Sequence, residues 1–272
     1  MSATISKPAA APAVQTTGSD YFRQFAVIFV TVLTIVVNGL ATSLPINGIA
    51  TGAISDQFPV LFTPAGYVFS IWGVIYLALI AYTVYQALPS QRANPRLRAI
   101  GWIYVVSGLA NSGWIFLWHY FQFGISVIVM LVLLASLVLI YLRLWPSRNT
   151  VSRGEWWTTN LAFSIYLGWI TVATVANITI FLYSIGWNGG GIAPELWTIM
   201  MLVIAAALGV YFGLRRFDGA YVLVLVWAFV GIFQKQSATP LVAWTALGLA
   251  IGLAAVAVFA FVQGRRTAQL PA

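Results

Sequence analysis

The sequence contains no cysteine, one histidine and five acidic residues in 272 positions. Without cysteine there are no disulfides, thiolate nucleophiles, iron–sulfur clusters or cysteine-ligated zinc. A lone histidine, His119, excludes a metal site built from several histidines. Charged residues make up 7% of the chain, against about 25% in a typical soluble domain, so water cannot solvate its surface. A soluble enzyme, a nucleic-acid-binding protein and a disordered protein are therefore excluded.

What the chain has instead is hydrophobic residues, at 61%, arranged in runs of about 20 that match the thickness of a bilayer. Such runs are expected to be helices, because barrel strands would alternate polar and apolar residues. We predict an all-α, polytopic membrane helix bundle of about eight transmembrane helices. Their expected spans are 22–44, 66–88, 99–121, 124–144, 156–182, 195–214, 219–234 and 240–263, of which the seventh is the shortest.

Basic residues indicate the orientation of these spans. With both termini in the cytoplasm, 12 of the 13 Lys and Arg side chains lie on the cytoplasmic side and only Lys235 lies outside. This distribution follows the positive-inside rule, and one span more or fewer would invert every loop downstream. We expect an integral protein of the bacterial cytoplasmic membrane with both termini inside.

Every Asp and Glu falls in a loop or at the end of a predicted span. Proton- and ion-driven carriers place ionisable groups inside the bundle, so their absence disfavours that class but leaves a passive carrier open. No nucleophile–base pair can be assembled from the apolar spans, so we do not expect an enzyme. The chemistry that remains, from aromatic rings, hydroxyls and amides, suits binding.

Tryptophan is abundant, with 12 residues, and several lie near span ends as an interfacial belt would place them. Trp72, Trp114 and Trp169 lie inside spans instead, where an indole N–H needs a hydrogen-bond partner or a ligand. On the fifth span Trp169, Ala173 and Asn177 form one helical stripe. The stripe is either the wall of a pocket or a set of contacts between helices.

Three segments resemble the translocator protein and tryptophan-rich sensory protein family (TspO/MBR). Residues 64–76 carry P-x-G-Y-V-F-x-x-W-x-x-x-Y, residues 110–114 read ANSGW, and residues 168–177 read GWITVATVAN. They are similar, in the same order, to the family's second, third and fifth helices. The resemblance covers about residues 22–182 and implies a five-helix core. Residues 1–21 would then be a disordered cytoplasmic tail, 183–264 three additional transmembrane helices, and 265–272 a short basic tail.

The resemblance also implies a ligand, because members of the family bind tetrapyrroles, and some bind sterols, in a pocket under the long loop between helices one and two. The corresponding loop here runs from Pro45 to about Thr63, on the side that carries Asp56 and no base. No cofactor is required, and a porphyrin or haem would be a ligand. The residues placed around the pocket are Tyr67, Trp72, Asn111, Trp114, Trp169, Ala173 and Asn177.

The chain departs from the family pattern in three places. One residue, often accompanied by proline in the family, is missing between Phe69 and Trp72, which changes the direction expected for the Trp72 ring. Phe116 stands where the family has a proline, so we expect no kink in the third helix. The extra helices carry a small-residue stripe, Ala205, Gly209 and Gly213, suited either to packing within the chain or to a homodimer face.

The sequence thus predicts a membrane receptor, sensor or carrier that holds a planar hydrophobic small molecule in an aromatic pocket. A permease component for another small molecule and a non-binding assembly partner are the alternatives. His119, at the outer end of the third span, is expected either to hydrogen-bond to solvent or loop backbone or, less favoured, to bind haem iron. The partners we expect are the apolar ligand, the lipid bilayer and in one reading a second copy, but no nucleic acid.

Overall fold

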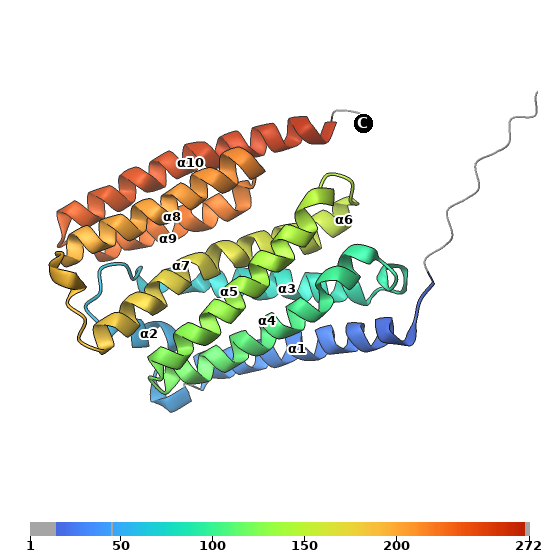
Figure 1. Cartoon of the computed structure of the whole chain (residues 1–272), viewed down its shortest axis with the longest axis horizontal. Helices are drawn as coiled ribbons and strands as arrows, with labels where there is room; N and C mark the ends of the chain where they lie inside the picture. The colour runs from blue at the N-terminus through green and yellow to red at the C-terminus, as the bar shows by residue number, and fades with distance from the viewer. Residues whose placement is uncertain (1–14, 45, 270–272) are drawn as a thin grey trace, which may run out of the picture.

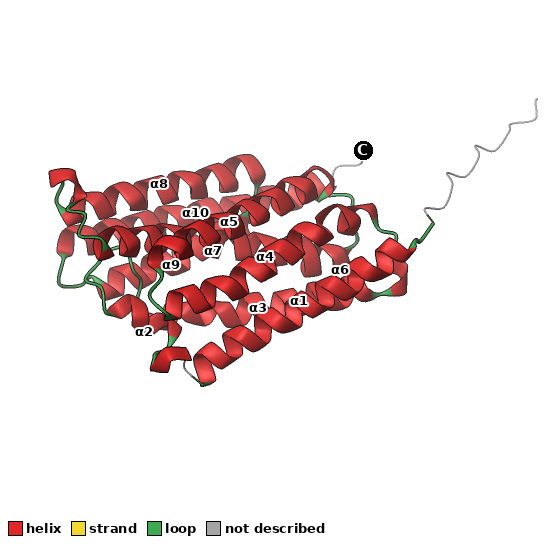
Figure 2. Ribbon diagram, turned by 60° about the horizontal axis from the view of Figure 1, so that its bottom comes forward, coloured by secondary structure: helices red, strands yellow, loops and turns green. Residues whose placement is uncertain are grey.

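The computed structural model describes residues 15–44 and 46–269, and the side chains of 15–44 and 46–264. Residues 1–14, which are most of the expected tail, residue 45 and residues 270–272 lie outside this range. The described part consists of helices joined by loops and turns and contains no strand (Figure 2). Seven of its helices are long and apolar enough to cross a membrane, which confirms the predicted polytopic bundle. An eighth apolar helix, α9, has 17 residues, at the lower limit for a span.

The long helices lie side by side and alternate in direction (Figure 1). They are α1 (Gly18–Ser43), α3 (Ile71–Ala87), α4 (Pro95–His119), α5 (Phe123–Leu144), α7 (Leu161–Ser184), α8 (Pro194–Arg216), α9 (Gly219–Lys235) and α10 (Pro240–Gln269). Short helices α2 (Thr51–Asp56) and α6 (Arg153–Glu155), a π-helical turn (Trp156–Asn160) and several 3₁₀ turns (Ile46–Gly48, Gly66–Ser70, Pro89–Gln91, Trp145–Ser147 and Gly189–Gly191) connect them.

Both terminal helices extend beyond the expected spans. α1 begins at Gly18, four residues before the predicted start, because the Asp20 carboxylate accepts a hydrogen bond from the Thr17 backbone N–H at 2.9 Å. α10 continues to Gln269, so residues expected as a basic tail extend the last helix. α4 is one uninterrupted helix through Phe116, as the missing proline predicts.

The bundle has two chemically different ends. The connections α3–α4, α5–α7 and α8–α9 lie at one end, which we call the basic end because every arginine among residues 15–264 lies there (Figure 1). The start of α1 and the end of α10 lie at the same end. The opposite end, which we call the loop end, holds the connections α1–α3, α4–α5, α7–α8 and α9–α10. This is the segregation that the positive-inside pattern predicts.

The three C-terminal helices join the rest of the bundle through α9. Gly168 of α7 packs against Tyr221 and Val224 of α9, and the Gly231 carbonyl of α9 accepts the Ala65 N–H at 3.1 Å. The stripe of Ala205, Gly209 and Gly213 faces α9 and α10, with Gly209 against Leu225 and Leu253. It therefore serves packing within the chain, the first of the two interpretations.

Candidate functional site

An aromatic cluster lies between α3 and α7, midway along the bundle. The ring of Trp169 meets those of Phe69 and Trp72 edge to face, with centroids 5.7 and 6.2 Å apart. Trp72 also stacks on Tyr76 at 5.6 Å and meets Tyr166 at 6.0 Å. Two of the predicted pocket residues, Trp72 and Trp169, are thus brought into direct contact, and Trp72 remains half-buried.

Two buried tryptophans differ in how their indole N–H groups are satisfied. Trp114 Nε1 donates to Asn177 Oδ1 at 3.1 Å, and Asn177 Nδ2 donates to Ser126 Oγ at 2.9 Å. Trp169 is only 2% exposed, yet its Nε1 meets no hydrogen-bond acceptor among the described residues. A buried donor without an acceptor costs about 1–3 kcal/mol. Among the buried tryptophans of the described residues, Trp169 is therefore the one whose indole N–H still lacks an acceptor.

The two predicted amides link helices. Asn111 is fully buried, accepts from Asn38 Nδ2 at 2.8 Å and donates to Tyr166 Oη at 2.9 Å, which joins α1, α4 and α7. Through Tyr166 it also touches the aromatic cluster at Trp72. Asn177 joins α7 to α4 and α5 through Trp114 and Ser126. Both amides are thus satisfied within the protein.

The remaining two predicted residues lie in different surroundings. Ala173 is half-buried on α7, one turn beyond Trp169 on the same stripe. Tyr67 is 42% exposed and packs edge-on against Trp227 of α9 at 5.2 Å, away from the other six. The set thus divides into the Trp72–Trp169 contact with Asn111 behind it, the Trp114–Asn177 pair, Ala173 between them, and Tyr67 apart.

The long loop after α1 covers the loop end of the bundle and is fixed to α4 and α9. His119 is fully buried, with Nδ1 2.8 Å from the Ile46 carbonyl and Nε2 2.9 Å from Thr51 Oγ1, so both ring nitrogens face the loop. Trp118 Nε1 donates to the Thr51 carbonyl at 3.0 Å. Lys235 of α9 donates to Asp56 at 2.5 Å. A basic side chain thus lies against this loop, although the loop itself contains none.

The histidine contacts are those of the loop-bonding interpretation, because a haem iron could bind His119 only after one of these hydrogen bonds broke. No group of three His, Cys, Asp or Glu side chains in the described part of the chain could hold a metal ion.

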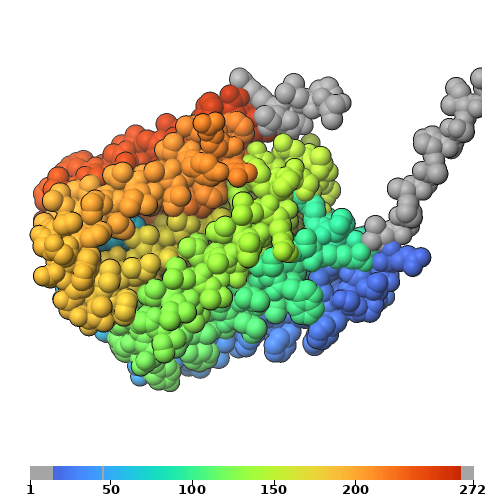
Figure 3. Space-filling model, viewed as in Figure 1, coloured from blue at the N-terminus to red at the C-terminus, as the bar shows by residue number. Residues whose placement is uncertain are grey.

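A cavity of about 380 Å³ opens beneath this loop, between α7 and the start of α8. Figure 3 shows the molecule hollowed between these two helices. The walls are mostly apolar and include Phe62, Tyr183, Trp187 and Trp197. The size falls in the range of small-molecule sites, but none of the seven predicted residues lines it.

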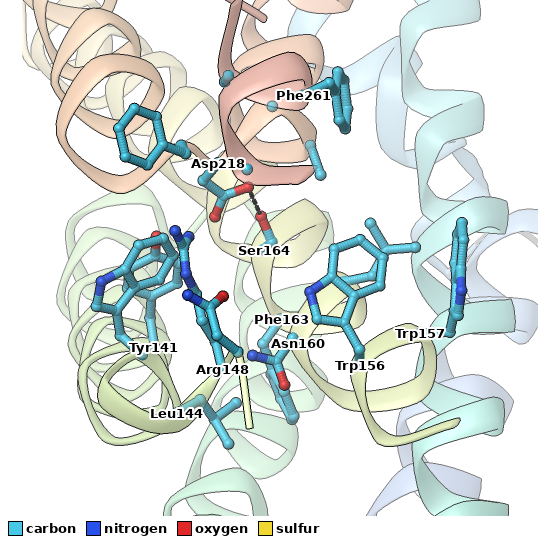
Figure 4. Close-up of a pocket in the computed structure, with 18 of the residues that line it drawn as sticks. Tyr141, Leu144, Arg148, Trp156, Trp157, Asn160, Phe163, Ser164, Asp218 and Phe261 are labelled. Carbon is cyan, nitrogen blue, oxygen red and sulfur yellow. Dashed lines mark hydrogen bonds between the residues drawn. The ribbon is translucent and has the colours of Figure 1, made fainter. Parts of the chain in front are cut away.

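A larger cavity of about 730 Å³ lies at the basic end, among α5, the π-helical turn, α9 and α10 (Figure 4). The turn, a feature frequent at functional sites, presents Trp156 and Asn160 to it. Arg96 holds the turn in place by donating to Glu155 at 2.6 Å and to Asn160 Oδ1 at 2.9 Å.

Two ionisable side chains face each other across part of this cavity. Asp218 is 8% exposed and accepts from Ser164 Oγ at 2.5 Å and from the Tyr221 N–H at 3.1 Å. Burial raises the pKa of the Asp218 carboxyl and lowers the pKa of the Arg148 guanidinium. For each group, the cost of burying the charged form therefore exceeds its attraction to the other.

Sequence reasoning placed Asp218 in a loop and gave Arg148 only a topological role. The missed signal is the length of the connection between α8 and α9, which consists of only Phe217 and Asp218. So short a connection holds its side chains against the bundle.

A model of the family described as TSPO-like protein matches residues 24–259, which include the three C-terminal helices as well as the predicted five-helix core. Searches among curated proteins and among solved structures gave no match. Because the family match covers most of the chain, this membrane protein belongs to the TSPO-like protein family.

Proposed function

We propose that this chain is a membrane receptor or carrier for a planar, apolar small molecule of the tetrapyrrole kind, held at the aromatic cluster between α3 and α7. The buried, unpaired indole N–H of Trp169 is the observation that carries the proposal. A ligand with a ring nitrogen or a carbonyl oxygen at this point supplies the missing acceptor. Binding, rather than catalysis, is the activity that these side chains support.

The rings around Trp169 suit a flat ligand. Trp72 and Phe69 are half-buried, so they can move aside at less cost than a fully buried ring. Each aromatic contact adds about 0.5–1.5 kcal/mol beyond the burial of area. The small side chain of Ala173 lies on the same face of α7, one turn from Trp169. A closed cluster that opens for its ligand is a common form of conformational selection.

The test is a tryptophan-fluorescence titration of the purified full chain with a panel of porphyrins, sterols and carotenoids. Trp169→Phe keeps a ring but loses the donor, and we expect it to weaken binding of the best ligand about tenfold. Trp244→Phe is the matched control, because Trp244 is 66% exposed on α10, and it should bind as the wild type does. Flat titrations for the whole panel would instead favour the assembly partner.

Transport rather than sensing is favoured by one further observation. The two cavities lie at the two ends of α7, with Ser164 lining the basic-end cavity and Thr179 the loop-end cavity, and the cluster lies between them. We propose the orientation with both termini in the cytoplasm of a bacterial cell, so a carrier would pass its ligand along α7. Flux of the bound ligand into proteoliposomes identifies a carrier, and binding without flux identifies a receptor.

A further inference from the structure

The basic-end cavity is lined by more positive than negative charge, because Arg148 and Arg153 both line it and Asp218 is the one acid among its lining residues. The four ion pairs among the described residues engage Asp20, Asp56 and Glu155, and none of them includes Arg148. The guanidinium of Arg148 lies 3.5 Å above the Trp145 ring and donates to the Arg216 carbonyl at the end of α8. These two contacts fix its plane and leave most of its five donors for another group.

The nearby acid, Asp218, attracts Arg148 but forms no ion pair with it. Both donors to Asp218, the Ser164 hydroxyl and the Tyr221 N–H, reach the same carboxylate oxygen. Tyr141 also lines the cavity, and its hydroxyl is buried without a well-formed hydrogen bond among the described residues. The donors that face a ligand therefore include the guanidinium groups of Arg148 and Arg153, which both line the cavity, and the Tyr141 hydroxyl, a set that favours an anion.

The opposite wall of the cavity is apolar. In Figure 4 Arg148 lies on one side, and Trp156 and Phe261 lie on the other. A volume of about 730 Å³ is far larger than a small anion needs. The cavity also lies at the end of the bundle that carries the arginines, where the positive-inside rule places the cytoplasmic lipid head groups. Basic pockets between helices on this side of a membrane are suited to anionic lipids.

We propose that the basic-end cavity binds an amphiphile with an anionic head group, a carboxylate or a phosphodiester, whose head lies on Arg148 and whose apolar part lies along Trp156 and Phe261. The source is either a lipid of the cytoplasmic leaflet or a free fatty acid, since both present the same chemistry. This site is separate from the Trp169 cluster, so either proposal can fail alone.

The experiment uses the full chain in phosphatidylcholine nanodiscs, with bound molecules counted by native mass spectrometry. Phosphatidylglycerol and oleate are the two anionic amphiphiles, added phosphatidylcholine tests for a requirement for net charge, and inorganic phosphate tests for a requirement for the tail. We expect phosphatidylglycerol or oleate to bind at least about tenfold more tightly than phosphatidylcholine, with no competition from phosphate. Whichever of the two binds more tightly identifies the source.

Variants assign the binding to this cavity. Arg148→Gln should weaken it about tenfold or more, whereas Arg143→Gln, which removes an exposed arginine in the last turn of α5, should change it less than about twofold. Ala220→Phe keeps the charge but fills the cavity, and it should lose binding too, which covers the case in which Arg148→Gln does not fold. Trp169→Phe should bind the amphiphile normally. Unchanged binding in both Arg148→Gln and Ala220→Phe, equal affinity for phosphatidylcholine, or displacement by phosphate would overturn the proposal.

Discussion

At the residue scale, the proposed binding function depends most on the indole of Trp169. Trp114, another buried tryptophan, donates to Asn177 and so has a structural hydrogen bond. Trp169 lies among aromatic rings, which accept an N–H bond only weakly. The free-energy cost of burying its N–H is therefore not offset by a hydrogen bond. A ligand acceptor at this point would restore that free energy and would distinguish the bound from the empty protein.

Ala173 lies one helical turn from this indole on α7 and tests whether the ligand binds there. Replacing it with phenylalanine puts a ring where the ligand would lie, so we expect Ala173→Phe to weaken ligand binding by more than about tenfold with little change in melting temperature. Ala207→Phe, on an exposed face of α8, is the control. If Ala173→Phe instead lowers the melting temperature and spares affinity, Ala173 is a helix contact, which overpacking destabilises by about 1–3 kcal/mol.

Asp218 predicts a dependence of stability on pH. Burial raises the pKa of its carboxyl above the ordinary 3.8, so in the folded state it keeps a proton that the unfolded chain releases. The free energy of unfolding should therefore fall as pH rises from about 4 through the raised pKa, and then level off. Asp218→Asn keeps the acceptor for Ser164 without the charge, so its melting temperature should fall less over this range. Parallel pH profiles for the two proteins would contradict this account.

At the scale of elements, α9 joins the two parts of the bundle although, with 17 residues, it is no longer than α3 and shorter than the other apolar helices. It contacts α7 through Gly168, and the segment before α3 through Gly231 and through Trp227, whose Nε1 donates to the Val68 carbonyl at 3.0 Å. A short helix serves here because these contacts, rather than its length, fix its position. The family match extends over it, which agrees with a single packed unit.

Gly231 tests that role. A Cβ at this position would collide with the Val68 side chain and lie 3.1 Å from Pro64, so we expect Gly231→Ala to destabilise the protein by about 1–3 kcal/mol. Gly248→Ala on α10 meets nothing within 4 Å and should be neutral or slightly stabilising. Denaturation of both variants in detergent measures the difference. Equal stability of the two would mean that α9 and the segment before α3 are not tightly packed.

Sequence reasoning predicted the elements well, because a bilayer imposes the length and apolarity of its helices. It also placed Trp169, Ala173 and Asn177 on one stripe by helical periodicity alone. Hydrogen-bond partners were beyond its reach: the Asn111–Tyr166 and His119–Thr51 contacts join residues 55 and 68 positions apart. The basic-end cavity was missed for the same reason, since its walls come from four separate stretches of chain.

At the scale of the whole molecule, the two ends differ in charge, and this difference orients the protein in a membrane. Because the chain has no native cysteine, single cysteines report on each side without background. We expect Gln57→Cys, exposed in the loop after α1, to be labelled by an impermeant thiol reagent in intact cells, and Ser90→Cys, between α3 and α4, to be labelled only after lysis. Labelling of Ser90→Cys in intact cells would contradict the orientation.

The most direct measurement of the central claim is the indole N–H resonance of Trp169 in ¹⁵N-tryptophan-labelled protein, assigned by its loss in Trp169→Phe. On titration with the ligand that binds most tightly in the panel, this resonance should move downfield as the proton gains an acceptor, while the Trp244 resonance stays in place. A ligand that saturates the protein and leaves the Trp169 resonance unmoved would contradict the account, because the binding site would then lie elsewhere.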